Sequence, residues 1–224
     1  MKQIIFLFIV AIVLSFFSCG KEKKIEDCPK EFELPAQVSP YQSTYSIGDT
    51  IVLVSKFSKY VYEDNTKKTY NMENIIWGAG MRILRIDSSN NFEDALKTSI
   101  SNYFSIISCT DTNRYLFSYS DGGDYVDAKY SYNKDSFNLS IELTPKKKGV
   151  FIITFGGGLD NSSQDFEGKC NNVNFNAYGF LNKGKDNNID LLKESPMEHC
   201  NTWILQNPYD RFYKKRFYAF KVIE

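Results

Sequence analysis

Alternation of apolar and polar residues predicts a chain built mostly of β-strands. The clearest strand runs over 136–143, where Phe137, Leu139, Ile141 and Leu143 share one face and polar residues occupy the other. The run 150–155 is apolar on both faces, which is typical of a strand in the middle of a sheet. Further strands are expected at 31–38, 51–57, 81–86, 103–108, 114–119, 125–132 and 217–223. Many short strands separated by turns favour an antiparallel β-sandwich.

Three local signals refine this pattern. Pro35 lacks a backbone N–H, so the strand over 31–38 is expected at a sheet edge. The polar stretch 60–74 predicts a loop. Asn91, followed by acidic residues and then Ala95 and Leu96, predicts a capped short helix.

The segment 160–207 differs from the rest of the chain. It is rich in Asn, Gly, Ser and charged residues, with one strand-like run at 173–180 and one helical run at 189–194. Loops of this length are uncommon unless they are functional, disordered or cross-linked. We therefore expect a long irregular insertion before the last strand.

The amino-terminal 18 residues have the pattern of an export signal. Lys2 precedes an apolar run, and Ser18 stands immediately before Cys19. A transmembrane helix is the first alternative, but the apolar stretch of about 14 residues is shorter than the roughly 20 that a span needs. An ordinary signal peptide with an incidental cysteine is the second. The stretch 16–20 resembles a bacterial lipoprotein signal, which implies lipid attachment at Cys19.

This resemblance sets the expected layout of the chain. Residues 1–18 are the signal peptide, 19–27 a charged tether, and 28–224 one β-sandwich domain with the insertion at 160–207. Bacterial lipoproteins carry more than one acyl chain, and two chains hold a protein stably on a membrane. Gly20 resembles the outer-membrane sorting pattern of such proteins. The partner implied is therefore the outer membrane, with the periplasmic and the cell-surface face both open.

Two short stretches resemble a known fold family. The sequence at 45–51, Tyr-Ser-Ile-Gly-Asp-Thr-Ile, and that at 147–155, Lys-Lys-Gly-Val-Phe-Ile-Ile-Thr-Phe, resemble strands of immunoglobulin-like domains in bacterial surface lipoproteins. The resemblance implies an immunoglobulin-like sandwich.

Four cysteines remain besides Cys19: Cys28, Cys109, Cys170 and Cys200. An even number in an exported chain indicates disulfides, and four cysteines allow three pairings. Because Cys170 and Cys200 both lie in the insertion, we expect them to pair and to staple it. Cys28 then pairs with Cys109 by elimination.

Charge and motifs exclude several functions. The 27 basic residues equal the 27 acidic ones, so no strong positive field is available for nucleic acid. His199 is the only histidine, so the chain offers few ligands for a zinc site. Any Ser/His/Asp catalytic site would have to include this residue. Gly156–Gly158 lacks the Lys-Ser/Thr pair of a phosphate-binding loop. We expect no cofactor, no metal and no assigned catalytic residue.

Four aromatic residues near the end of the insertion are the candidates for ligand contact: Trp203, Tyr209, Phe212 and Tyr213. Such rings can stack on sugars or proteins, although half or more of the set is expected in the core. The first hypothesis is a binding module in the envelope that contacts a glycan, a peptide or an envelope protein. The rival is a carboxylate-dependent hydrolase of the cell envelope using residues such as Glu194 and Glu198.

Overall fold

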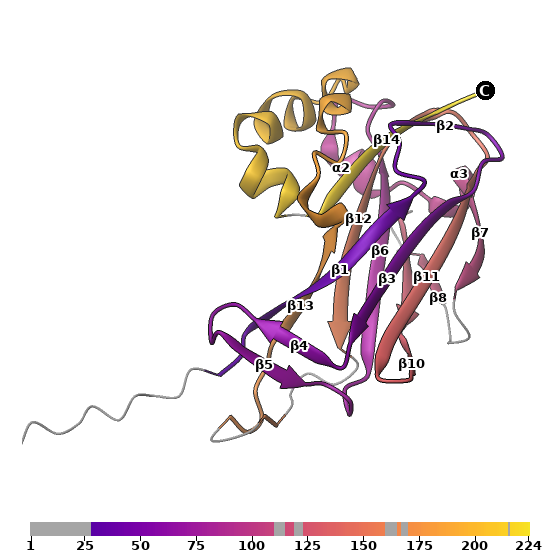
Figure 1. Ribbon diagram of the computed structural model, residues 1–224. Coiled ribbons are helices and arrows are strands. Elements are labelled where there is room, and N and C mark those ends of the chain that lie inside the picture. Colours follow the sequence, from indigo (N-terminus) through magenta and orange to yellow (C-terminus); the bar gives the residue numbers. More distant parts are fainter. Residues whose placement is uncertain (1–27, 110–114, 119–122, 160–164, 167–169, 215) are drawn as a thin grey trace, which may run out of the picture.

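The computed structural model describes residues 28–109, 115–118, 123–159, 165–166, 170–214 and 216–224, and Cys19 with the signal and tether therefore lies outside the described residues. Within them the protein is mostly β (Figure 1). The strands are β1 (Glu31–Ser39), β2 (Thr44–Ser46), β3 (Ile51–Ser58), β4 (Tyr60–Glu63), β5 (Lys68–Asn71), β6 (Trp77–Arg85), β7 (Phe104–Cys109), β8 (Tyr115–Ser118), β9 (Asp124–Lys129), β10 (Ser131–Asn133), β11 (Ser136–Pro145), β12 (Gly149–Leu159), β13 (Asn176–Leu181) and β14 (Phe217–Ile223).

The hydrogen-bonded strand order is β10-β11-β3-β1-β13-β12-β6-β9-β8, and this sheet folds back on itself into two layers. The layers meet through aromatic side chains. The ring of Phe57 on β3 lies 5.6 Å from that of Trp77 on β6, and Phe137 on β11 lies 6.1 Å from Trp77. These buried edge-to-face contacts fill the space between the layers. The predicted mostly β, sandwich-like fold is confirmed.

Two details of the predicted topology are wrong. The sheet is not wholly antiparallel, because β1 pairs in parallel with β13, and β14 with β2. β1 is not an edge strand either, since it lies between β3 and β13. The antiparallel register with β3 begins at Ala36, so Pro35 stands just outside that ladder. Its carbonyl accepts a hydrogen bond from the Ser55 hydroxyl (2.7 Å) instead.

From β13 onward the insertion is folded rather than an irregular loop. After β13 the chain forms the short helices η1 (Asn182–Gly184), η2 (Ile189–Glu194), η3 (His199–Ile204) and, just beyond the insertion, η4 (Tyr209–Tyr213), of 3-10 or π type. We call η2–η4 the helical cap. Its buried apolar residues, Leu192, Met197, Ile204 and Phe212, pack against the outer face of β6, β12 and β14. This packing explains why β12 is apolar on both faces, as predicted: one faces the sandwich core and the other the cap.

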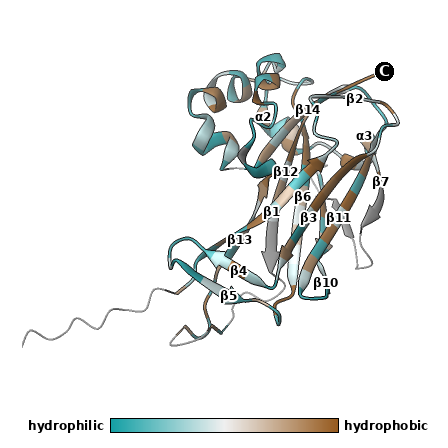
Figure 2. Ribbon diagram, in the orientation of Figure 1, coloured by the Kyte–Doolittle hydropathy of each residue, from teal (hydrophilic) through white to brown (hydrophobic). Residues whose placement is uncertain are grey.

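The predicted loop at 60–74 contains the hairpin of β4 and β5. Figure 2 shows this hairpin to be hydrophilic, whereas hydrophobic residues concentrate along the strands of the two layers. The predicted helix after Asn91 is confirmed as α2 (Phe92–Leu96), with the Asn91 side chain accepting a hydrogen bond from the Glu93 N–H (3.0 Å). A second short helix, α3 (Ile100–Tyr103), leads into β7.

The disulfide overturns both predicted pairings. Cys28 is bonded to Cys170, and Cys200 is a buried free thiol in η3. The side chain of Cys109 lies outside the described residues. The bond ties the residue before β1 to the segment before β13, which are the two strands that pair in parallel. It therefore joins the starts of β1 and β13 instead of closing the insertion on itself.

Candidate ligand-binding cleft

Along the parallel ribbon of β1 and β13, side chains alternate between the buried core and the outer face. Phe32, Leu34 and Ala36 are buried in the core, whereas Glu31 and Glu33 are exposed. The register places Tyr178 beside Glu33 and Phe180 beside Pro35. The outer face of this ribbon thus presents carboxylates on one strand and aromatic rings on the other.

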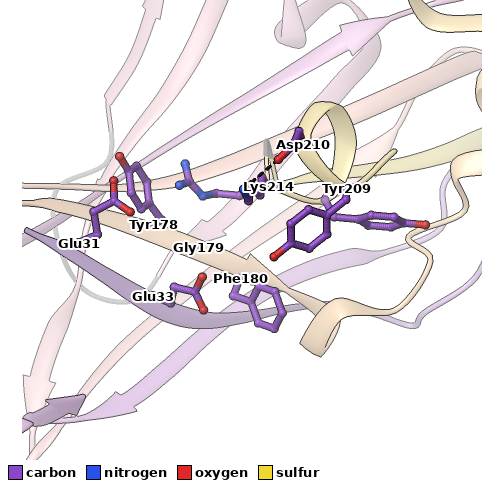
Figure 3. Close-up of a pocket in the computed structure, with 10 residues that line it drawn as sticks. Glu31, Glu33, Tyr178, Gly179, Phe180, Tyr209, Asp210 and Lys214 are labelled. Carbon is purple, nitrogen blue, oxygen red and sulfur yellow. Dashed lines mark hydrogen bonds and ion pairs between the residues drawn. The ribbon is translucent and has the colours of Figure 1, made fainter. Parts of the chain in front are cut away.

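Helix η4 and the turn after it stand over this face and enclose a cleft of about 540 Å³, which we call the β13 cleft (Figure 3). Figure 3 shows the carboxylates of Glu31 and Glu33 on β1 at one side and the Tyr209 ring on η4 at the other. The lining residues are Glu31, Glu33, Tyr178, Gly179, Phe180, Tyr209, Asp210, Tyr213, Lys214 and Arg216.

Arg216 supplies a partly buried cation to this cleft. Its backbone is in the left-handed region (φ 63°), and its guanidinium lies 3.4 Å from the centre of the Tyr178 ring. Burial lowers the pKa of Arg216, while Tyr178 and the carboxylates of Glu31 and Glu33 oppose that shift. The guanidinium stays charged and is held flat against an aromatic ring.

The rim carries rings that face solvent. Tyr209 is 65% exposed and Phe180 39% exposed. Lys214 forms an ion pair with Asp210 (2.8 Å) and lies 4.9 Å from the centre of the Tyr209 ring. The Lys214 charge is therefore already compensated, and the aromatic faces remain the apolar contact surface of the cleft.

A second cleft of about 430 Å³, the β4 cleft, lies on the other side of β1. Its lining includes Glu31 and Glu33 again, together with Tyr60 and Tyr62 of β4. Both tyrosines point outward, 58% and 53% exposed, because alternation along β4 buries Val61 and Glu63 instead.

Glu63 fixes β4 to β1. Its buried carboxylate accepts hydrogen bonds from the backbone N–H of Thr66 (2.6 Å), the Thr66 hydroxyl (2.7 Å) and the Asn65 side chain (3.0 Å). The N–H groups of Lys30 and Glu31 also donate to it, at 3.5 and 3.4 Å. Burial by itself would raise the pKa of Glu63, but these donors outweigh it and the pKa is lowered.

The four aromatic candidates separate into three groups. Tyr209 and Tyr213 line the β13 cleft. Phe212 is fully buried between the cap and the sheet, so its candidacy for ligand contact is corrected: it is a core residue. Trp203 is 43% exposed but lies on η3, where His199 stacks on it (4.5 Å) and Arg211 covers it (4.1 Å).

The residues suggested for hydrolysis are not brought together in either cleft. Glu194 forms an ion pair with Lys221 (2.6 Å), and Glu198 is exposed at the start of η3. His199 packs between the rings of Phe92 and Trp203. Among the described residues, no group of three or more His, Cys, Asp and Glu side chains could hold a metal ion. No helix in the same part of the chain combines the length and apolarity of a membrane span.

The residues that sequence reasoning missed are Glu31, Glu33, Tyr178, Phe180, Arg216, Tyr60 and Tyr62. Alternation at 31–37 does place the two glutamates on the solvent face of a strand. However, the sequence carries no local signal that this strand meets 176–181, some 145 positions further on. The site exists only once that pairing forms.

No family model and no curated protein matches the chain. Among solved structures it is similar to the human F-spondin reeler domain, with 12% identity over 67% of this chain and 95% of that chain, at a TM-score of 0.32. It is also similar to a type II cohesin domain from the cellulosome of Acetivibrio cellulolyticus, with 8% identity over 65% and 91%, at a TM-score of 0.30. A third is the C-terminal domain of the Streptococcus agalactiae AgI/II polypeptide BspA, with 9% identity over 66% and 50%, at a TM-score of 0.31.

Proposed function

We propose that the protein is a binding module of the bacterial cell envelope that holds its ligand in the β13 cleft. One observation carries this proposal: the cleft brings the exposed rings of Phe180 and Tyr209 together with the carboxylates of Glu31 and Glu33. A concave site with apolar rings and a few directed polar groups is the usual form of a small-ligand site. Packing on rings and hydrogen bonding to carboxylates produce binding without a chemical step.

The proposal includes a lipid anchor at Cys19 in the outer membrane. The lipoprotein-like sequence at 16–20 supports it. A tether at 19–27 reaches at most about 30 Å when fully extended, and Glu31 follows Cys28 by three positions. An anchored protein would therefore hold the cleft close to the membrane surface.

Binding is tested with the full-length protein in detergent, applied to an array of bacterial and host glycans and to purified envelope fractions. We expect the Phe180→Ala/Tyr209→Ala double variant to bind its ligand about tenfold more weakly or worse, because it removes both exposed rings of the cleft. A tenfold loss corresponds to about 1.4 kcal/mol of binding free energy. The matched control is Trp203→Ala, which removes an exposed ring outside the cleft. Equal loss in both variants would refute the proposed site.

The anchor is tested separately. Cells fed a clickable fatty acid should label the wild-type protein and should not label a Cys19→Ser variant. Labelling that survives this substitution would refute lipid attachment at Cys19 without affecting the assignment of the cleft.

A further inference from the structure

Glu31 and Glu33 line both clefts. This sharing follows from topology, because β13 pairs along one edge of the first half of β1, and Glu63 of β4 faces Phe32 on the other edge. The two clefts are therefore separated only by the outer face of one strand. A ligand lying across Glu31 and Glu33 reaches both of them.

Solvent-facing aromatic rings lie on each side of the outer face of β1. Phe180 and Tyr209 stand on the β13 side, and Tyr60 and Tyr62 stand on the β4 side. Two apolar platforms with a line of carboxylates between them suit an extended ligand whose apolar faces and hydroxyl groups recur along its length.

We propose that the two clefts form one site for a linear glycan of uncharged sugars that crosses β1. This inference rests on the proposed function and specifies its ligand class. The C–H faces of sugar rings pack on the electron-rich faces of the aromatic rings. The hydroxyl groups donate to the carboxylates of Glu31 and Glu33, which act only as acceptors when ionised.

The charged residues around the outer face of β1 favour an uncharged glycan over an acidic one. Lys214 is paired with Asp210, and Lys67 with Asp64. Arg216 is stacked on Tyr178 in the floor of the β13 cleft. Together the two clefts are lined by four carboxylates, Glu31, Glu33, Asp64 and Asp210, and by two cations, Lys214 and Arg216. The lining is therefore negative on balance and repels carboxylates or sulfates.

A protein partner fits this surface less well. Stable protein interfaces bury about 1,200–2,000 Å² around a core depleted of charge. Here the centre of the surface is a pair of carboxylates on an exposed strand, and the apolar rings stand at its two sides.

Both sides of the site are held in place before any ligand arrives. Glu63, at the end of β4, accepts hydrogen bonds from the backbone N–H groups of Lys30 and Glu31, which fixes the turn of the β4–β5 hairpin to β1. The Cys28–Cys170 bond ties the same end of β1 to the segment that leads into β13. A rigid site loses little conformational entropy on binding.

The test measures binding of full-length protein in detergent to an array of neutral linear glycans: glucans, mannans, galactans, xylans and polymers of N-acetylglucosamine. Polygalacturonate and hyaluronate are the acidic comparators. Size fractions of the bound neutral glycan are then titrated. We expect affinity to rise with chain length until both clefts are filled. Tyr60→Ala/Tyr62→Ala and Phe180→Ala/Tyr209→Ala should each weaken binding of the longest fraction by about tenfold. Trp203→Ala should leave it unchanged.

Four results would overturn the inference. Loss confined to Phe180→Ala/Tyr209→Ala would mean that the clefts are separate, and the proposed function would survive. Loss confined to Tyr60→Ala/Tyr62→Ala would refute the proposed function as well, because the ligand would then lie outside the β13 cleft. Binding only to acidic glycans would refute the charge argument. Binding to an envelope protein, with no neutral glycan bound and with dependence on Phe180 and Tyr209, would refute the ligand class alone.

As an independent measurement, Glu31→Gln/Glu33→Gln should reduce the ratio of affinities for neutral over acidic glycan by about tenfold. An unchanged ratio would contradict the assigned role of these carboxylates.

Discussion

The ring of Phe155 on β12 lies directly against Gly179 on β13: a Cβ atom added to Gly179 would stand 2.2 Å from Cδ1 of Phe155. Only glycine permits this approach, so the residue under the floor of the β13 cleft is set by packing. Alternation along β13 then places Tyr178 and Phe180, on either side of Gly179, on the outer face.

The first prediction follows from this contact. Gly179→Ala should destabilise the protein by about 1–3 kcal/mol, the usual cost of overpacking a core, measured by urea unfolding. Gly156→Ala on β12 is the control, since its added Cβ meets nothing within 4 Å. Equal midpoints for the two variants would show that Phe155 moves aside without cost.

The second prediction concerns the disulfide. Non-reducing peptide mapping should yield a fragment that links Cys28 to Cys170. The bond joins residues 142 positions apart, so its removal in a Cys28→Ala/Cys170→Ala variant should lower stability by roughly 3–5 kcal/mol according to chain entropy. A linked peptide containing Cys200 would contradict the structure.

Cys200 provides a third prediction. Burial raises the pKa of its thiol to about 11, so at pH 8 it is protonated as well as inaccessible. Iodoacetamide should therefore label the Cys200 peptide only when urea is present. Prompt labelling in native buffer would show that the cap opens readily. The peptide containing Cys170, mapped in the same digest, is the matched reference for an oxidised cysteine.

What the sequence predicted well is local. The alternation over β11 and the two apolar faces of β12 follow directly from residue order, as does the Asn91 cap. The pairing of β1 with β13 and the partner of Cys28 depend on contacts between distant segments, which no local pattern specifies. The clefts depend on that pairing and were missed for the same reason.

Of the helical cap, the sequence predicted only the helical run at 189–194, which is η2. The rest of the cap was missed because its apolar residues lack a regular helical repeat. Leu192, Ile204 and Phe212 lie on three short helices, and Met197 lies on the turn between η2 and η3. The sheet supplies the stabilisation, since helices of this length are marginal alone. Phe212 therefore looked like a ligand-binding ring in sequence although it is buried.

The fourth prediction is an acid sensitivity centred on Glu63. Because hydrogen bonds lower its pKa in the folded state, Glu63 stabilises the fold above its unfolded pKa of about 4.3, and this contribution is lost as pH falls through the lower folded value. Glu63→Gln should cost roughly 1–3 kcal/mol at pH 7, where one acceptor becomes a donor facing N–H groups. The difference should shrink towards pH 3. Glu198→Gln, at an exposed position, should show neither effect.

The last prediction concerns His199, which packs against Phe92 (4.1 Å) and Trp203 (4.5 Å). Burial lowers its pKa, and the nearby Arg211 guanidinium lowers it further. The folded state therefore binds the proton less readily than the unfolded state, so stability should fall as pH drops below about 6.5. Urea unfolding at pH 7.5 and 5.5 should show this loss in the wild type and a smaller loss in His199→Phe, which keeps an aromatic ring without a titrating group. Because all carboxylates are common to both proteins, an identical loss in the two would mean that the imidazole accepts its proton without disturbing the cap.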